Sequence, residues 1–125
     1  LTAELLLNYQ RCSRRAFLDV YGDIDQRDPP SDYLLKLMQD SREHQQTVLG
    51  ERALHRPHYP AGDLVMGAQT TLTLMQQGVE QIHQGVLLTE MGEEVTLVST
   101  PDLLVKHPGQ SIFGDWLYVP TEIKL

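Results

Sequence analysis

The stretch WLYVPTEIKL at residues 116–125 is rich in β-branched and aromatic side chains, and it carries Glu122 and Lys124 at alternate positions. Because side chains alternate across a strand, we expect Glu122 and Lys124 to share one face of a strand here. A second apolar run, LVSTPDLLVK at residues 97–106, contains Asp102 directly after a proline. If the two strands pair, Asp102 and Glu122 converge at one edge of the sheet.

The first half of the chain has the periodicity of α-helices. The spacing of apolar residues predicts helices at about 3–21, 32–54 and 64–77. In the first of these, side chains spaced by three or four residues form one stripe that we expect to face the core: Leu5, Tyr9, Cys12, Ala16 and Val20.

The composition changes after Gly78 to runs typical of strands. We expect strands at about 79–89, 94–106 and 116–125, separated by the turn sequences MGE and PGQSIFGD. Short connections favour an antiparallel meander. The predicted fold class is therefore α/β, with N-terminal helices followed by a three-stranded antiparallel meander in one domain or part of one.

Length, composition and charge narrow the function classes. The chain has 125 residues, of which 41% are hydrophobic, and no apolar run approaches the ~20 residues of a membrane helix, so we expect no membrane partner. The single cysteine, Cys12, excludes an internal disulfide and fits a reducing cytoplasm. The net charge of −7 argues against broad, nonspecific binding of phosphates, but it is compatible with a local nucleic-acid site whose carboxylates hold metal ions.

The residues at the predicted sheet edge suggest a metal site. Two carboxylates as close as Asp102 and Glu122 repel each other, and burying both is costly unless a cation lies between them. Oxygen ligands of this kind suit Mg²⁺ or Mn²⁺. A lysine beside the metal, Lys124, can position water and stabilise charge on a phosphate. The alternative is that all three are ordinary sheet charges, with Glu122 and Lys124 facing solvent.

His44 is a further candidate ligand. It follows Leu37 by seven residues and precedes Val48 by four, so it lies on the inward stripe of the predicted second helix. From the residues alone, it is either a hydrogen-bonded residue at the core boundary or a metal ligand.

Two other clusters have functional and ordinary interpretations. Arg11, Arg14 and Arg15 form a basic patch near one end of the first predicted helix, which either contacts phosphates or is a solvated face. His55 and His58 have an H-x-x-H spacing in a proline-rich loop. Without cysteine or a second ligand pair, this spacing indicates a flexible loop rather than a zinc site.

Several motifs together resemble a known family. The pair "PD" followed by "EIK" resembles the signature of the PD-(D/E)XK nuclease superfamily. NYQRCSRRAFLD at 8–19 and DSREHQQTVL at 40–49 are similar to the opening helix and the helical histidine motif of its RecB-like branch, which includes CRISPR-associated RecB-type exonucleases. LMQQGVEQIHQGVL at 74–87, running into TPDLLVK at 100–106, resembles the helix and first strands of uncharacterised RecB-like nucleases.

This resemblance implies a restriction-endonuclease-like fold and a Mg²⁺- or Mn²⁺-dependent nuclease, a RecB-like exonuclease acting on DNA rather than RNA in DNA repair or processing. It implies that Asp102, Glu122, the backbone carbonyl of Ile123 and His44 are metal ligands. Asp102 and Glu122 would then be catalytic together with Lys124. The alternative is a degenerate nuclease fold that serves as a nucleic-acid- or protein-binding module.

The sequence also departs from the family pattern. Ser41 replaces the glycine usually found three residues before the histidine, and the Gln/Tyr helix that follows the lysine strand is absent. We therefore expect that the C-terminal part of the fold is missing, that the fragment is inactive or weakly active alone, and that its exposed sheet permits a homodimer. Cys12 matches the first cysteine of the iron–sulfur members, but a cluster needs three more. We expect no iron–sulfur cluster, and instead expect Cys12 to be a small apolar residue facing the core.

Overall fold

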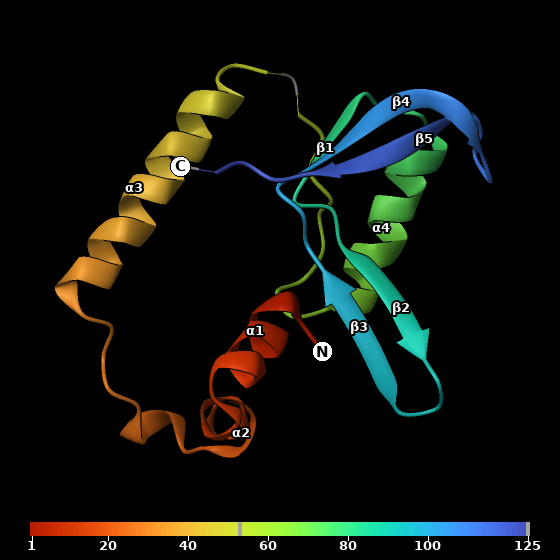
Figure 1. The fold of residues 1–125 in the computed structure, drawn as a ribbon. Helices are drawn as coiled ribbons and strands as arrows, with labels where there is room; N and C mark the ends of the chain where they lie inside the picture. The colour runs from red at the N-terminus through yellow and green to blue at the C-terminus, as the bar shows by residue number, and fades with distance from the viewer. Residues whose placement is uncertain (53, 125) are drawn as a thin grey trace. The chain divides into compact units, whose positions relative to one another are not determined.

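The fold is that of a computed structural model, which describes residues 1–52 and 54–124. The chain divides into two compact units, Leu1–Leu49 and Gly50–Lys124, each of which is described by itself. Helices precede the strands along the chain (Figure 1). The expected order of helices first and antiparallel strands second is therefore confirmed.

The first unit is helical, with elements α1 (Ala3–Arg11), α2 (Ser13–Tyr21), a 3₁₀ turn η1 (Ile24–Gln26) and α3 (Asp32–Leu49). Two of these replace the single helix expected at 3–21. Cys12 separates α1 from α2 with an extended backbone, φ −161° and ψ 107°. Across this break, Asn8 Nδ2 donates a hydrogen bond of 2.9 Å to Asp19 Oδ2, which joins the two helices.

The break changes which side chains of the first unit are buried. Ala16 is buried as expected, but Cys12 is exposed and Tyr9 is 64% exposed. The polar Asn8 is buried instead, at 6% exposure. The prediction that Cys12 faces the core is therefore wrong, because the extended residue interrupts the helical register on which the stripe depended.

The second expected helix is shorter than its periodicity indicates. α3 ends at Leu49, and Gly50 adopts a positive φ of 54°, a conformation that commonly ends helices. Leu54 is therefore not helical, and Ala53 lies outside the described residues. The apolar positions of α3 keep between 37% and 48% exposure at Leu34, Leu37, Met38 and Val48.

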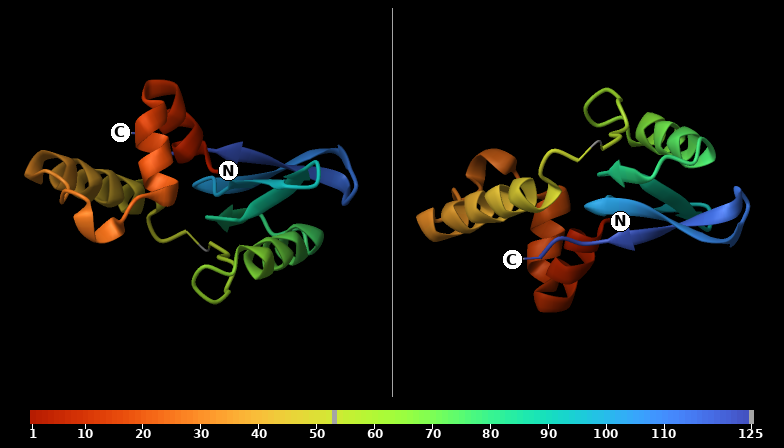
Figure 2. Two further views of the ribbon diagram at one scale, coloured as in Figure 1. Left: turned by 90° about the horizontal axis from the view of Figure 1, so that it is seen from below. Right: turned by 90° about the horizontal axis from the view of Figure 1, so that it is seen from above.

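The second unit contains α4 (Leu64–Gln76), β1 (Gln81–His83), β2 (Leu87–Met91), β3 (Val95–Ser99), β4 (Leu103–Ser111) and β5 (Gly114–Thr121). The strands form a three-stranded antiparallel sheet in the order β1-β4-β5 and a separate hairpin, β2-β3. α4 lies along one side of the strands in both views of Figure 2. Trp116 Nε1 donates to the carbonyl of Met75 at 3.0 Å, and this bond ties β5 to the C-terminal turn of α4.

The prediction of a single three-stranded meander is wrong, because the first two expected strands are each divided into two. The run 79–89 breaks after His83, where Gln84 has a positive φ of 50° and Gly85 packs closely on β4. A Cβ atom on Gly85 would lie 2.7 Å from Leu104 Cδ1, so any other residue would require the buried Leu104 side chain to shift. The run 94–106 breaks at 100–102, where Pro101 has no N–H to donate to a ladder. The last strand ends at Thr121 rather than 125, and Leu125 lies outside the described residues.

The core of the second unit is built around Ile82, Val86 and Leu104, which are at most 1% exposed. Thr71 on α4 is equally buried. Its hydroxyl donates to the carbonyl of Gly67 at 2.8 Å and accepts the N–H of Val86 at 2.9 Å. This side chain therefore pairs the backbone of the loop before β2 with the helix.

Replacing Thr71 by valine should destabilise the fold. Valine keeps the shape of the side chain, but it leaves the buried N–H of Val86 without this acceptor, which costs about 1–3 kcal/mol in the free energy of unfolding. Thr73→Val is the matched control, since the Thr73 hydroxyl also donates to a carbonyl four residues earlier but is exposed. Urea denaturation should separate the two variants, and equal stabilities would contradict a special role for Thr71.

Candidate active site

The two predicted carboxylates lie at the same end of the three-stranded sheet. In the pairing of β4 with β5, Leu103 lies opposite Thr121. Asp102 directly precedes Leu103, and Glu122 directly follows Thr121. Asp102 and Glu122 therefore lie just beyond the last residue pair of the β4–β5 ladder, at the same end of the sheet.

Asp102 is bonded to the segment that carries the other candidates. Its Oδ2 accepts the backbone N–H of Ile123 at 2.7 Å, a short, charge-assisted hydrogen bond. The carbonyl of Asp102 accepts the N–H of Gln84 at 3.0 Å, which fixes its backbone beside β1. The side chain is half-buried. Asp102 thus connects the start of β4 with the segment 122–124.

Glu122 and Lys124 lie beyond the end of β5 and not within a strand. Their side chains form an ion pair, with Lys124 Nζ 3.5 Å from Glu122 Oε2. Both are exposed, at 79% for Lys124 and 55% for Glu122. An exposed pair of this kind is worth at most about 1 kcal/mol, so both side chains can turn to other partners at little cost.

His44 lies on α3 in the first unit and is half-buried there. Asp102 and Glu122 belong to the second unit. His44 and the two carboxylates thus belong to different units, and a ligand set that combines them stays a prediction.

The side chains at this end of the sheet supply only some of the ligands that a hard divalent cation needs. Within residues 1–52 and 54–124, no group of three or more His, Cys, Asp or Glu side chains is placed to hold a metal ion. Asp102 and Glu122 supply carboxylate oxygens, the ligands that Mg²⁺ and Mn²⁺ prefer, and Mg²⁺ usually keeps several waters. The contact that Ile123 makes with Asp102 is through its N–H, so its carbonyl stays a predicted ligand.

Sequence reasoning did not find two residues beside Asp102, namely His83 and Arg56. Burial lowers the pKa of His83, the charge of Arg56 lowers it further, and the charge of Asp102 raises it. The charges of Arg56 and Asp102 therefore both act on His83 at this end of the sheet. No spacing in the sequence indicates this, because it depends on His55, next to Arg56, forming a parallel bridge with Ile82.

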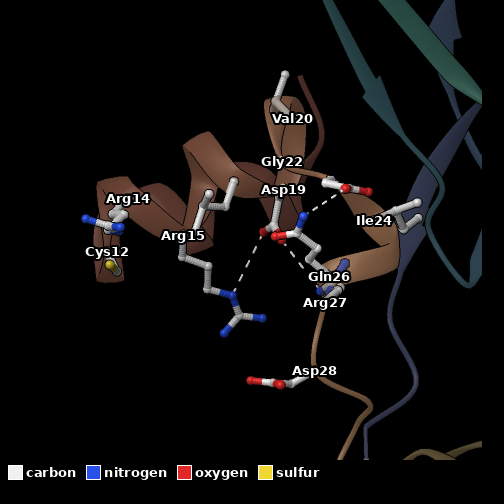
Figure 3. A pocket seen from close by; sticks show the side chains of 12 residues that line it. Cys12, Arg14, Arg15, Asp19, Val20, Gly22, Ile24, Gln26, Arg27 and Asp28 are labelled. Atoms are coloured by element: carbon white, nitrogen blue, oxygen red, sulfur yellow. Dashed lines mark hydrogen bonds and ion pairs between the residues drawn. The ribbon is translucent and has the colours of Figure 1, made fainter.

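The basic patch predicted on the first helix is partly neutralised by an aspartate, Asp19. Arg14 and Arg15 line an open pocket of about 1010 Å³ in the first unit (Figure 3). Arg15 Nε lies 3.9 Å from Asp19 Oδ2, and Arg27 Nη2 lies 3.5 Å from Asp19 Oδ1. Asp19 therefore offsets part of the positive charge with which the patch would meet a phosphate. Arg11, at the end of α1, is exposed.

Comparisons with protein-family models, with curated proteins and with solved structures find no match for this chain. In the part of the chain that the structure describes, no helix combines the length and apolar character needed to cross a bilayer.

Proposed function

We propose that this chain belongs to a metal-dependent nuclease of the RecB-like PD-(D/E)XK type that hydrolyses phosphodiester bonds of DNA. The observation that carries this proposal is the hydrogen bond of 2.7 Å between Asp102 and the backbone of Ile123. It joins the "PD" and "EIK" motifs, which are far apart in the sequence. The β4–β5 hairpin brings these positions together, and the motifs place a carboxylate, Asp102, at one of them and Glu122 and Lys124 beside the other.

The carboxylates of Asp102 and Glu122, with the carbonyl of Ile123, would hold Mg²⁺ or Mn²⁺. When bound, such an ion acts as a Lewis acid on the phosphate and lowers the pKa of water. Asp102 is half-buried, and its hydrogen bond to the backbone of Ile123 ties the segment 122–124 to the start of β4.

Lys124 is suited to act on the phosphate. Its ammonium group is a compact charge with three donors, which can orient an attacking water and stabilise negative charge developing on the phosphate. It is 79% exposed and its partner is Glu122. If Glu122 held a cation, Lys124 would lose this partner and its ammonium group would be available to a phosphate.

A binding module is the second candidate function. It is favoured by the finding that, among the described residues, no three metal-ligating side chains gather in one place. In that case the protein would bind a nucleic acid or another protein without cleaving it, and binding would not require a divalent cation.

The test is a cleavage assay on the full-length protein with single-stranded DNA, duplex DNA and RNA. We expect no cleavage in EDTA, cleavage of DNA after addition of Mn²⁺ or Mg²⁺, and a loss of about 100-fold or more in Glu122→Gln, which removes a carboxylate charge from the site. Glu80→Gln is the matched control, because Glu80 also pairs with a lysine at 3.5 Å and is exposed.

One result would decide against the nuclease, and another would decide against the role of Glu122. One is binding of nucleic acid without cleavage under every metal condition, which supports the binding module. The other is equal cleavage by Glu122→Gln and Glu80→Gln, which would show that Glu122 has no part in the site.

A further inference from the structure

Positive charge is scarce in the second unit, whose lysine and arginine residues are Arg52, Arg56, Lys106 and Lys124. Lys106 lies 3.5 Å from Glu80 Oε1 and 5.2 Å from the centre of the Trp116 ring. Lys124 is paired with Glu122. A site that binds a polyanion here therefore depends on few cations, and the placement of the two arginines becomes decisive.

Arg56 is held against the edge of the three-stranded sheet by its neighbour. His55 donates its N–H to the carbonyl of Gln81 at 3.3 Å and accepts the N–H of His83 at 2.8 Å, as a short added strand beside β1. Pro57 on the other side of Arg56 is buried, whereas the Arg56 side chain is exposed. The backbone of Arg56 is thus anchored on both sides and its guanidinium group is accessible.

His83 links this edge to Asp102. It is the last residue of β1 and lies opposite Leu103, the residue after Asp102. Because Ile82 is fully buried and side chains alternate, His83 projects from the opposite face of the strand. The next N–H, that of Gln84, donates to the carbonyl of Asp102 at 3.0 Å.

Four segments consequently meet in a row at one end of the sheet: 55–57, 83–84, 102 and 122–124. Neighbouring strands are about 4.8 Å apart, so the backbones of Arg56 and Asp102 are separated by roughly 10 Å. A long arginine side chain bridges part of that distance. The influence of both Arg56 and Asp102 on the pKa of His83 agrees with this order.

We propose that Arg56, with His83 beside it, binds a phosphate of the nucleic-acid backbone next to the phosphodiester bond that Asp102 and Glu122 would present for hydrolysis. The guanidinium fork matches two phosphate oxygens, and the imidazole adds an N–H donor. This inference rests on the proposed function for the identity of its ligand. It explains how an acidic protein holds a polyanion close to its carboxylates: Arg56 lies at the same end of the sheet as Asp102, with β1 between them.

The test is binding of a short, fluorescein-labelled single-stranded DNA to the full-length protein in Ca²⁺, followed by fluorescence anisotropy at several salt concentrations. Arg56→Gln should weaken binding about tenfold and reduce the slope of log Kd against log salt by about 0.7, the share of one phosphate contact. Arg56→Lys keeps the charge but loses the planar guanidinium group. Its affinity for the DNA should lie between those of the unchanged protein and Arg56→Gln. Arg52→Gln is the matched control, with the same charge change four residues away, and should bind within about twofold of the unchanged protein.

His83→Leu, compared with His107→Leu, tests the second donor. His107 is exposed on β4, so its replacement should not alter binding, whereas His83→Leu should weaken it in the direction of Arg56→Gln. Thermal unfolding by circular dichroism checks that all variants are folded.

The outcomes separate this inference from the proposed function. Arg56-dependent binding without cleavage in Mn²⁺ keeps the phosphate site and overturns the nuclease. Cleavage with Arg56→Gln binding as tightly as Arg52→Gln overturns the phosphate site and keeps the nuclease. A protein that neither binds nor cleaves the DNA overturns both.

Discussion

Asp102→Ala is expected to reduce Mn²⁺-dependent cleavage of DNA to background, a loss of about 10³-fold or more. The substitution removes one of the two carboxylates that we propose as ligands, and with it the charge that a divalent cation requires. It also removes the acceptor of the Ile123 N–H, so the segment 122–124 loses its tie to β4. Single-turnover cleavage by the full-length protein is the measurement.

Two further variants show which of these losses matters. Asp102→Asn can still accept the N–H of Ile123 but has no charge, so it should be as inactive as Asp102→Ala. Asp115→Ala removes an exposed aspartate from the same sheet, at the far end of β5, and should cleave normally. Recovery of activity in Asp102→Asn would show that Asp102 has a structural role only.

Lys124→Ala should also lower the rate of cleavage by about 10²–10³-fold, while the affinity for the metal ion is retained or slightly increased. A cation beside the site repels Mg²⁺ and is not one of its ligands, so its removal affects the chemical step and not the metal. Lys124→Arg should recover little, because a planar fork does not place water as a compact ammonium does. The same single-turnover assay measures both.

Lys36→Ala, at an exposed position of α3, is the control for loss of a surface lysine. If Lys124→Ala cleaves as fast as Lys36→Ala, then Lys124 is an ordinary surface charge and the binding module becomes the better hypothesis. Such a surface change alters stability by no more than about 0.5 kcal/mol.

Periodicity was sufficient to predict which parts of the chain are helical and which form strands, because both patterns are local. It failed where the conformation of a single residue ends a helix or a strand. The stripe through Ala16 continues across Cys12 in the sequence, so periodicity could not reveal the break at Cys12, which the hydrogen bond between Asn8 and Asp19 spans. Such a contact depends on tertiary structure.

The division of the meander into two sheets had the same cause. Gly85 lies inside the strand expected at 79–89, and its role comes from the close approach of Leu104 on another strand. The convergence of Asp102 with the segment 122–124 was predictable, because it needs only the pairing of two neighbouring strands. Arg56 was not, since its position follows from a loop that bridges to β1.

The central claim, that Asp102 forms part of a site for a divalent cation, is tested most directly by calorimetric titration of Mn²⁺ into the full-length protein. The unchanged protein and Asp115→Ala should bind Mn²⁺ with the same affinity. Asp102→Ala should bind it more than about 100-fold more weakly, beyond the loss typical of residues that only support a ligand. Equal Mn²⁺ affinities for Asp102→Ala and Asp115→Ala, or no binding by the unchanged protein, would contradict the claim.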